Sequence, residues 1–134
     1  MPPPFKPLRL DHVVLRVRDM EKTLTFYRDV IGAELEREIP EIGMKQLRAG
    51  ASIIDLVPAE AGAEAVPESA QNMDHLCLRI EPWSESVLAA HFSHFSVPVE
   101  GEGIRYGAEG NGPSIYIRDP EGNVVELKGP PLEG

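Results

Sequence analysis

Two histidines occupy matching positions of a repeated segment. The sequence LDHVVLRV at residues 10–17 returns as MDHLCLRI at residues 73–80, and the histidine of each copy, His12 or His75, stands third. Asp, His, Leu and Arg keep their places in both copies, and the remaining positions are apolar. Imidazole nitrogens suit borderline divalent metals such as zinc, so the repeat points first to metal chemistry.

A second repeated segment supplies two carboxylates. Residues 52–56 read SIIDL and residues 123–127 read NVVEL, which places Asp55 and Glu126 at the same position of the two copies. The repeated segments therefore give each half of the chain one histidine and, downstream of it, one acid, and two such halves can converge on a single metal ion. Two imidazoles with one or two carboxylates suit zinc, nickel, cobalt, manganese or iron and leave positions open for a substrate with adjacent oxygens.

Periodicity and turn chemistry predict the elements that would hold these side chains. Alternation over residues 10–17 predicts a strand with His12 and Arg16 on one face. Asp19 is suited to cap a helix that ends at Gly32. Further strands of the first half are predicted at residues 33–39, 44–48 and 52–57.

The second half repeats this order of elements. The predicted elements are a strand at about 74–80, a helix at about 84–95 capped by Ser84, and a hairpin of strands 114–118 and 123–128. The Gly-rich stretch 100–112 is expected to be a flexible loop, with a lid over the site as the alternative. Each half is therefore predicted to be a βαβββ module.

Composition limits the kind of protein. The 134 residues suit a single domain, with module one at about 8–58, a linker at 59–72 and module two at about 73–129. A net charge of −9 without a basic stripe argues against nucleic-acid binding, and no apolar run approaches the length of a membrane span. The Pro-rich residues 1–7 suggest an extended arm rather than a secretory signal, and the single cysteine, Cys77, fits a cytoplasmic protein.

The repeated segments resemble those of the vicinal oxygen chelate superfamily, which includes glyoxalase I, fosfomycin-resistance thiol transferases, extradiol dioxygenases and bleomycin-binding proteins. The resemblance rests on LDHVVLRV, on FYRDVIG at residues 26–32 and, most specifically, on IRDPEGNVVE at residues 117–126. It implies an α+β fold, the glyoxalase/bleomycin-resistance/dioxygenase fold. In that fold, two βαβββ modules form a cup-shaped, eight-stranded mixed sheet around a divalent metal ion.

The resemblance also assigns metal ligands. The family's ligand positions fall on His12, His75 and Glu126. In glyoxalase I-like members the module-one equivalent of Glu126 is a ligand as well, and here that residue is Asp55. Because Asp is one methylene shorter than Glu, Asp55 can bind the metal directly, bind it through water, or move a substrate proton as a base.

Two further residues match positions that contact substrate in the family. Arg16 stands where glyoxalase I carries an arginine that contacts a glutathione carboxylate, and Tyr116 where fosfomycin-resistance enzymes carry a substrate-facing tyrosine. Ala59 replaces an expected asparagine, so the use of glutathione stays open. The alternatives are that Arg16 and Arg79, which recur together in the repeat, have a structural role, and that Tyr116 is a half-buried strand aromatic.

The function that the resemblance favours is a metal-dependent lyase or isomerase of glyoxalase type. It would act on a small oxygenated metabolite through a metal-stabilised enediolate while Glu126 or Asp55 relays a proton. One alternative is a dioxygenase with His12, His75 and Glu126 as an iron triad, or a fosfomycin-type thiol transferase, but a fourth ligand would fill a position that both need open. Another is a metal-free drug-binding protein, which would not need the His-His-Glu set. We expect a homodimer, and the sequence leaves open whether His12 meets His75 of its own chain.

Overall fold

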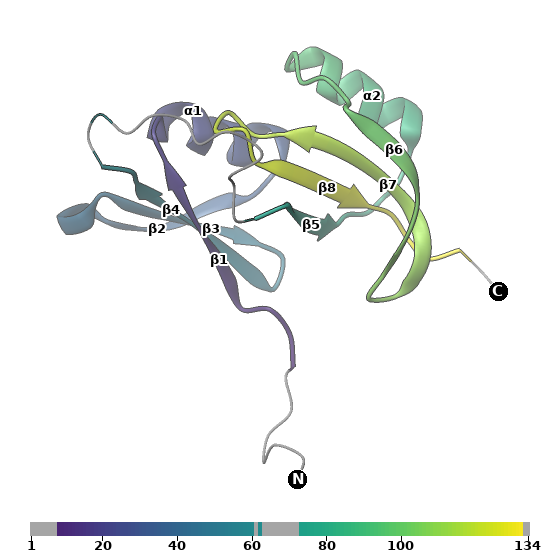
Figure 1. Cartoon of the computed structure of the whole chain (residues 1–134), viewed down its shortest axis with the longest axis horizontal. Helices are drawn as coiled ribbons and strands as arrows, with labels where there is room; N and C mark the ends of the chain where they lie inside the picture. The colour runs from purple at the N-terminus through teal and green to yellow at the C-terminus, as the bar shows by residue number, and fades with distance from the viewer. Residues whose placement is uncertain (1–7, 61, 63–72, 133–134) are drawn as a thin grey trace, which may run out of the picture. The chain divides into compact units, whose positions relative to one another are not determined.

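A computed structural model describes residues 8–60, 62 and 73–132 of the chain (Figure 1). The chain divides into two compact units, residues 1–63 and 64–134. The arm predicted at the N-terminus and most of the predicted linker lie outside the described residues. No helix in the described part of the chain is long and apolar enough to cross a membrane.

The first unit contains one four-stranded mixed sheet. Its elements are β1 (His12–Val17), α1 (Met20–Thr25), the π-helical turn η1 (Phe26–Val30), β2 (Glu34–Ile39), the 3-10 turn η2 (Pro40–Ile42), β3 (Met44–Ala49) and β4 (Ser52–Pro58). The strand order is β1-β4-β3-β2, with β1 parallel to β4 and the other pairs antiparallel. The helix begins as predicted, because the Asp19 side chain accepts a hydrogen bond from the backbone N–H of Lys22 at 3.0 Å.

The second unit repeats this topology. Its elements are β5 (His75–Arg79), α2 (Glu85–His94), β6 (Gly101–Gly107), β7 (Gly110–Arg118) and β8 (Val124–Lys128). The strand order is β5-β8-β7-β6, with β5 parallel to β8 and the other pairs antiparallel. The predicted α+β class and the βαβββ order of both halves are confirmed, with the eight strands divided between two four-stranded mixed sheets.

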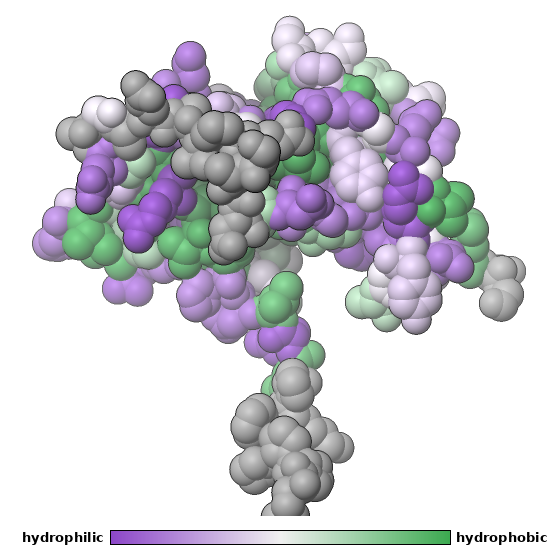
Figure 2. All heavy atoms as spheres, viewed as in Figure 1, coloured by the Kyte–Doolittle hydropathy of each residue, from purple (hydrophilic) through white to green (hydrophobic). Residues whose placement is uncertain are grey.

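Alternation along β1 and β5 separates a more buried face from an exposed face. In β1, Leu15 and Val17 are buried, whereas His12 and Arg16 are exposed. The buried side chains of the second unit include Phe92 of α2 and four residues of the sheet, Ile115, Ile117, Val125 and Leu127. We call the face that carries His12 and Arg16, or His75 and Arg79, the open face of its sheet. Hydrophilic side chains are frequent on the visible surface of both units (Figure 2).

The Gly-rich stretch 100–112 corrects one prediction. It is not a loop or a lid: it forms β6 and the beginning of β7, which pair antiparallel with Gly107 opposite Gly110. Glycine disfavours a strand because it has no side chain to pack. Here the missing side chain leaves room for a neighbour, since a Cβ at Gly107 would lie 2.7 Å from Lys128 Cε.

Candidate functional site

The second unit brings His75 and Glu126 into contact. His75 begins β5 opposite Val124 of β8, and Glu126 lies two residues further along β8, so both side chains are on the open face. His75 Nε2 lies 3.0 Å from Glu126 Oε1. Two of the residues predicted as metal ligands are therefore neighbours across a pair of parallel strands.

Polar contacts from two neighbouring strands hold the Glu126 carboxylate. The Glu126 side chain is buried, and Ser114 Oγ of β7 donates a hydrogen bond to Glu126 Oε2 at 2.6 Å. Cys77, directly opposite in β5, is exposed as a residue, but partial burial of its thiol, the negative charge of Glu126 and a hydrogen bond with that carboxylate raise the pKa of the thiol to about 11. A buried carboxylate needs such donors because burial removes its water. One oxygen faces Ser114, and the other faces His75.

The first unit has an equivalent arrangement around Asp55. Asp55 of β4 lies opposite Val14 of β1, two residues after the position opposite His12. Asp55 is buried, and Gln46 Nε2 of β3 donates a hydrogen bond to its Oδ1 at 3.0 Å. The pKa of His12 is raised by its hydrogen bond with Asp11 and, further, by the negative charge of Asp55.

An aspartate orients each histidine from the preceding position. Asp11 Oδ2 lies 2.8 Å from His12 Nδ1, and Asp74 Oδ2 lies 2.6 Å from His75 Nδ1. A carboxylate can only accept, so Nδ1 is the donor in both pairs, which leaves Nε2 for another partner. The Asp before each His in the repeated segment was the sequence signal for this role.

Each unit carries candidate donors for a metal ion. Among residues 8–60, 62 and 73–132, no group of three or more His, Cys, Asp or Glu side chains is close enough to hold a metal ion. Each unit supplies one histidine and one acid at equivalent positions of its sheet. The convergence of all four on one ion stays a prediction.

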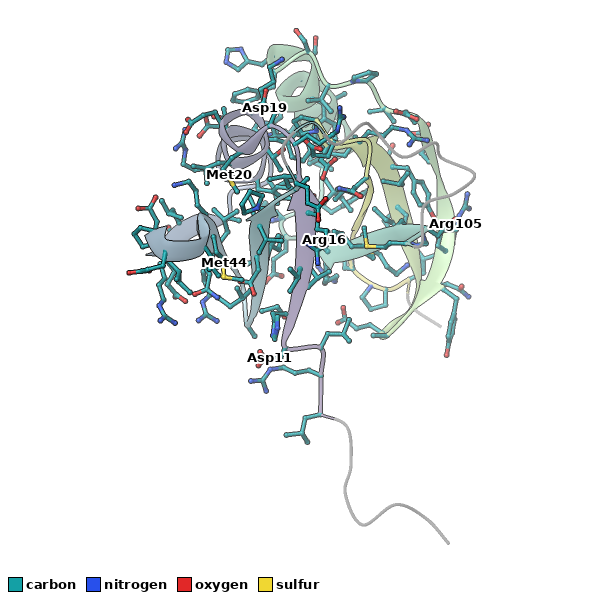
Figure 3. All side chains as sticks on the ribbon, turned by 60° about the vertical axis from the view of Figure 1, so that its left-hand side comes forward. Asp11, Arg16, Asp19, Met20, Met44 and Arg105 are labelled. Atoms are coloured by element: carbon teal, nitrogen blue, oxygen red, sulfur yellow. The ribbon has the colours of Figure 1, made fainter. Side chains whose placement is uncertain are left out.

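The predicted substrate contacts lie on the open faces. The Tyr116 ring of β7 lies 6.0 Å from the His75 ring, centroid to centroid, at an interplanar angle of 79°, and Tyr116 stands directly opposite Glu126. Arg16 is exposed on the open face of β1 (Figure 3). Sequence reasoning missed Arg105 of β6, whose guanidinium carbon lies 5.7 Å from the centre of the Tyr116 ring.

Comparisons with known sequences find a family and relatives that match over most of this chain. A model of the Glyoxalase/Bleomycin resistance protein/Dioxygenase superfamily matches residues 9–127. Virulence protein STM3117 of Salmonella typhimurium is 36% identical over 124 residues, which cover 89% of this chain and 82% of that protein. The mitochondrial methylmalonyl-CoA epimerase of Mus musculus is 26% identical over 137 residues, which cover 94% of this chain and 75% of the epimerase.

Solved structures extend the similarity to the fold. The crystal structure of STM3117 superposes with a TM-score of 0.74 at 29% identity and covers 93% of this chain and 98% of its own. A lactoylglutathione lyase from Agrobacterium tumefaciens gives a TM-score of 0.65 at 26% identity and covers 92% and 94% of the two chains. The fosfomycin resistance protein FosX of Listeria monocytogenes shares the fold, with a TM-score of 0.66 at 20% identity and coverage of 96% of each chain.

Proposed function

The chain belongs to the glyoxalase/bleomycin resistance protein/dioxygenase superfamily, and from this premise we propose that it is a metal-dependent lyase or isomerase. The proposed reaction removes and returns a proton on a carbon beside a carbonyl of a small oxygenated substrate. One observation carries the proposal: His75 Nε2 and Glu126 Oε1 lie 3.0 Å apart, while Nδ1 and Oε2 face Asp74 and Ser114. In this structure the two atoms are paired with each other, and after loss of the proton on Nε2 they would offer one nitrogen and one oxygen to a common ion.

The donor set suits a divalent ion. His75 Nε2 and Glu126 Oε1 lie 3.0 Å apart, and an imidazole nitrogen with a carboxylate oxygen is a donor pair that would hold such an ion. His12 and Asp55 hold the equivalent positions of the first unit. We assign all four residues to one site for zinc, nickel, cobalt, manganese or iron.

The chain's own acids would move the proton. A bound ion would polarise the substrate carbonyl and stabilise the negative charge that develops when the adjacent carbon loses its proton. Glu126 and Asp55 are both buried, and each has one oxygen held by a donor, Ser114 or Gln46. The other oxygen of either acid can bind the ion or accept the proton.

Two similar chains support this class of reaction. One is named a lactoylglutathione lyase and the other a methylmalonyl-CoA epimerase. Both named compounds are thioesters with a hydrogen on the carbon beside the carbonyl. Exchange of that hydrogen with deuterium from heavy water is therefore a suitable assay for a panel of 2-hydroxyacyl and 2-methylacyl thioesters, with the hemithioacetal of glutathione as a further substrate.

Elemental analysis of protein purified without chelator or metal-affinity resin is the first test. We expect near-stoichiometric metal in the wild type and its loss in both His12→Ala and His75→Ala. His94→Ala is the matched control, because His94 is an exposed histidine on α2. Nickel, cobalt or zinc would support the lyase or isomerase, iron would favour a dioxygenase, and manganese would favour a thiol transferase. Protein that neither contains nor takes up these ions would leave a metal-free binding protein as the function.

Asp55→Asn separates the two roles of this acid. Asparagine keeps the size of the side chain but cannot act as a base at neutral pH. If Asp55 is the base, the variant keeps its metal and loses proton exchange, by at least about a hundredfold. If Asp55 is a ligand, the variant loses metal affinity as well.

We further propose a cytoplasmic homodimer with two sites, each formed by His12 of one subunit and His75 of the other. In that arrangement the His12→Ala and His75→Ala chains, refolded together, recover one intact site in a mixed dimer. If each site lies within a single chain, both sites of the mixed dimer lack a histidine, and no activity returns. Light scattering of the mixture checks that the dimer has formed.

A further inference from the structure

The guanidinium of Arg105 lies over the ring of Tyr116, which in turn contacts His75, on the open face of the second sheet. Its Cζ is 5.7 Å from the centroid of the Tyr116 ring, and that ring lies 6.0 Å from the His75 ring. Figure 3 labels Arg105 on β6, the edge strand of this sheet. Two ring contacts therefore connect the guanidinium to the residues proposed to bind the ion.

Glycine at position 103 makes room for this guanidinium. A Cβ at Gly103 would lie 2.9 Å from Arg105 Cζ and closer still to Nη1, so any side chain there would displace the charged group. A Cβ at Gly101, two residues earlier on the same face, would meet only Tyr116 Cδ2 at an ordinary 3.7 Å. The backbone of Arg105 is fixed as well, because Lys128 Nζ donates a hydrogen bond to its carbonyl oxygen.

The charge of Arg105 lacks an acidic partner in the described part of the chain. Its guanidinium donates one hydrogen bond, from Nη1 to the carbonyl oxygen of Ile104 at 3.0 Å. Some other arginines are paired with a carboxylate: Arg48 with Glu36, Arg79 with Glu109 and Arg118 with Glu100. In a chain with 22 acidic and 13 basic residues, an arginine without a carboxylate next to a candidate site is available for a ligand.

We infer that Arg105 binds a terminal oxyanion of the substrate, a carboxylate or a phosphate, with the Tyr116 ring as the platform for its guanidinium. A planar guanidinium offers paired donors to such a group, and its cation–π contact with the Tyr116 ring favours this position. The inference rests on the proposed function for the reaction, and it makes the substrate a small anionic metabolite. Arg105 then determines specificity, while the acids and the ion act on the carbon that reacts.

Anion binding to chelator-treated protein tests this inference apart from the metal. Inorganic phosphate and acetate are titrated separately, and the NMR signals of the Arg105 Nε–H group and the Tyr116 ring report binding. We expect saturable shifts with one or both anions, and about tenfold or greater weakening in Arg105→Gln. Gly103→Ala should weaken binding similarly although it keeps the charge, because the added methyl group displaces the guanidinium.

Two control variants separate the local effect from a general one. Gly101→Ala adds the same methyl group to the same strand and should bind like the wild type. Arg37→Gln removes the same charge from an exposed position of β2 and should also bind like the wild type. Preference for phosphate or for acetate would identify which oxyanion the substrate carries.

Several results would overturn the inference. They are equal affinity in the wild type and Arg105→Gln, equal affinity in the wild type and Gly103→Ala, or no saturable shift with either anion. The titration contains no metal, so it tests Arg105 independently of the elemental analysis. If the anions bind but the protein takes up no metal, only the proposed function is refuted. Metal uptake without anion binding would refute the role of Arg105 alone.

Discussion

Removal of the Ser114 hydroxyl should destabilise the second unit and weaken metal binding. Ser114 is 1% exposed and Glu126 is 6% exposed, so water cannot replace the donor that Ser114→Ala removes. The lost bond is short, 2.6 Å between Oγ and Oε2, and one partner is a carboxylate. Hydrogen bonds to charged groups contribute about 1.5–3 kcal/mol to the free energy of unfolding. For a chain of this size that loss lowers the melting temperature by roughly 5–10 °C.

The same variant should bind metal about 10–100-fold more weakly, because the far oxygen of Glu126 is no longer held. Thermal unfolding of chelator-treated protein measures the first effect, and competition for zinc with a fluorescent chelator measures the second. Ser93→Ala, an exposed serine of α2, is the matched control and should change neither value. An unchanged melting temperature in Ser114→Ala would refute the buried hydrogen bond itself. A lower melting temperature with unchanged zinc affinity would refute the role of Ser114 in positioning Glu126 for metal binding.

Three further predictions follow from single features of the structure. Thr23→Val should raise the melting temperature by roughly 4 °C, because Thr23 Oγ1 is buried without a hydrogen-bond partner among the described residues; an unchanged value in calorimetry would contradict this. Gly112→Ala should cost about 1–3 kcal/mol in urea unfolding, because its Cβ would lie 2.7 Å from the Pro130 carbonyl oxygen; wild-type stability would contradict this close approach. With a thiol pKa of about 11, Cys77 in chelator-treated protein should react slowly with iodoacetamide at pH 8 and about tenfold faster for each pH unit up to that value. Glu126→Gln removes a charge that raises this pKa and should speed the reaction at pH 8, so an unchanged rate would argue against that contact.

The elements nearest the histidines could be predicted from the sequence because local rules decide them. Alternation marked β1 and β5, and the N-caps Asp19 and Ser84 are confirmed by hydrogen bonds from backbone N–H groups at 3.0 and 3.4 Å. The family prediction is confirmed by the match over residues 9–127. These signals need only neighbouring residues or a repeated motif.

The partners of the two acids could not be predicted, because strand register decides them. Ser114 is 12 residues from Glu126 and Gln46 is 9 residues from Asp55, and nothing local in either segment identifies these pairs. Arg105 was missed for a related reason. Its strand is rich in glycine, and glycine usually argues against a strand. Only the folded sheet shows that the missing side chain of Gly103 leaves room for the Arg105 guanidinium.

The two acids are also held differently, and this difference leads to a last prediction. Gln46, the donor to Asp55, stands directly opposite it. The residue opposite Glu126 is Tyr116, but the donor to Glu126 is Ser114, two residues before Tyr116 in β7. A glutamate is one methylene longer, so its carboxylate reaches a donor further along the neighbouring strand.

In the first unit that further position, two residues before Gln46 in β3, is Met44 (Figure 3), which cannot donate a hydrogen bond to a carboxylate. Asp55→Glu alone should therefore leave a buried carboxylate without its donor and cost about 1–3 kcal/mol of unfolding free energy. Met44→Ser in the same chain should recover part of that loss, although Met44→Ser by itself removes apolar contact and destabilises. A double-mutant cycle in urea measures the coupling between the two changes. Additive effects would show that the length of the acid and the position of its donor are not matched, and that the two modules do not hold their carboxylates by the same principle.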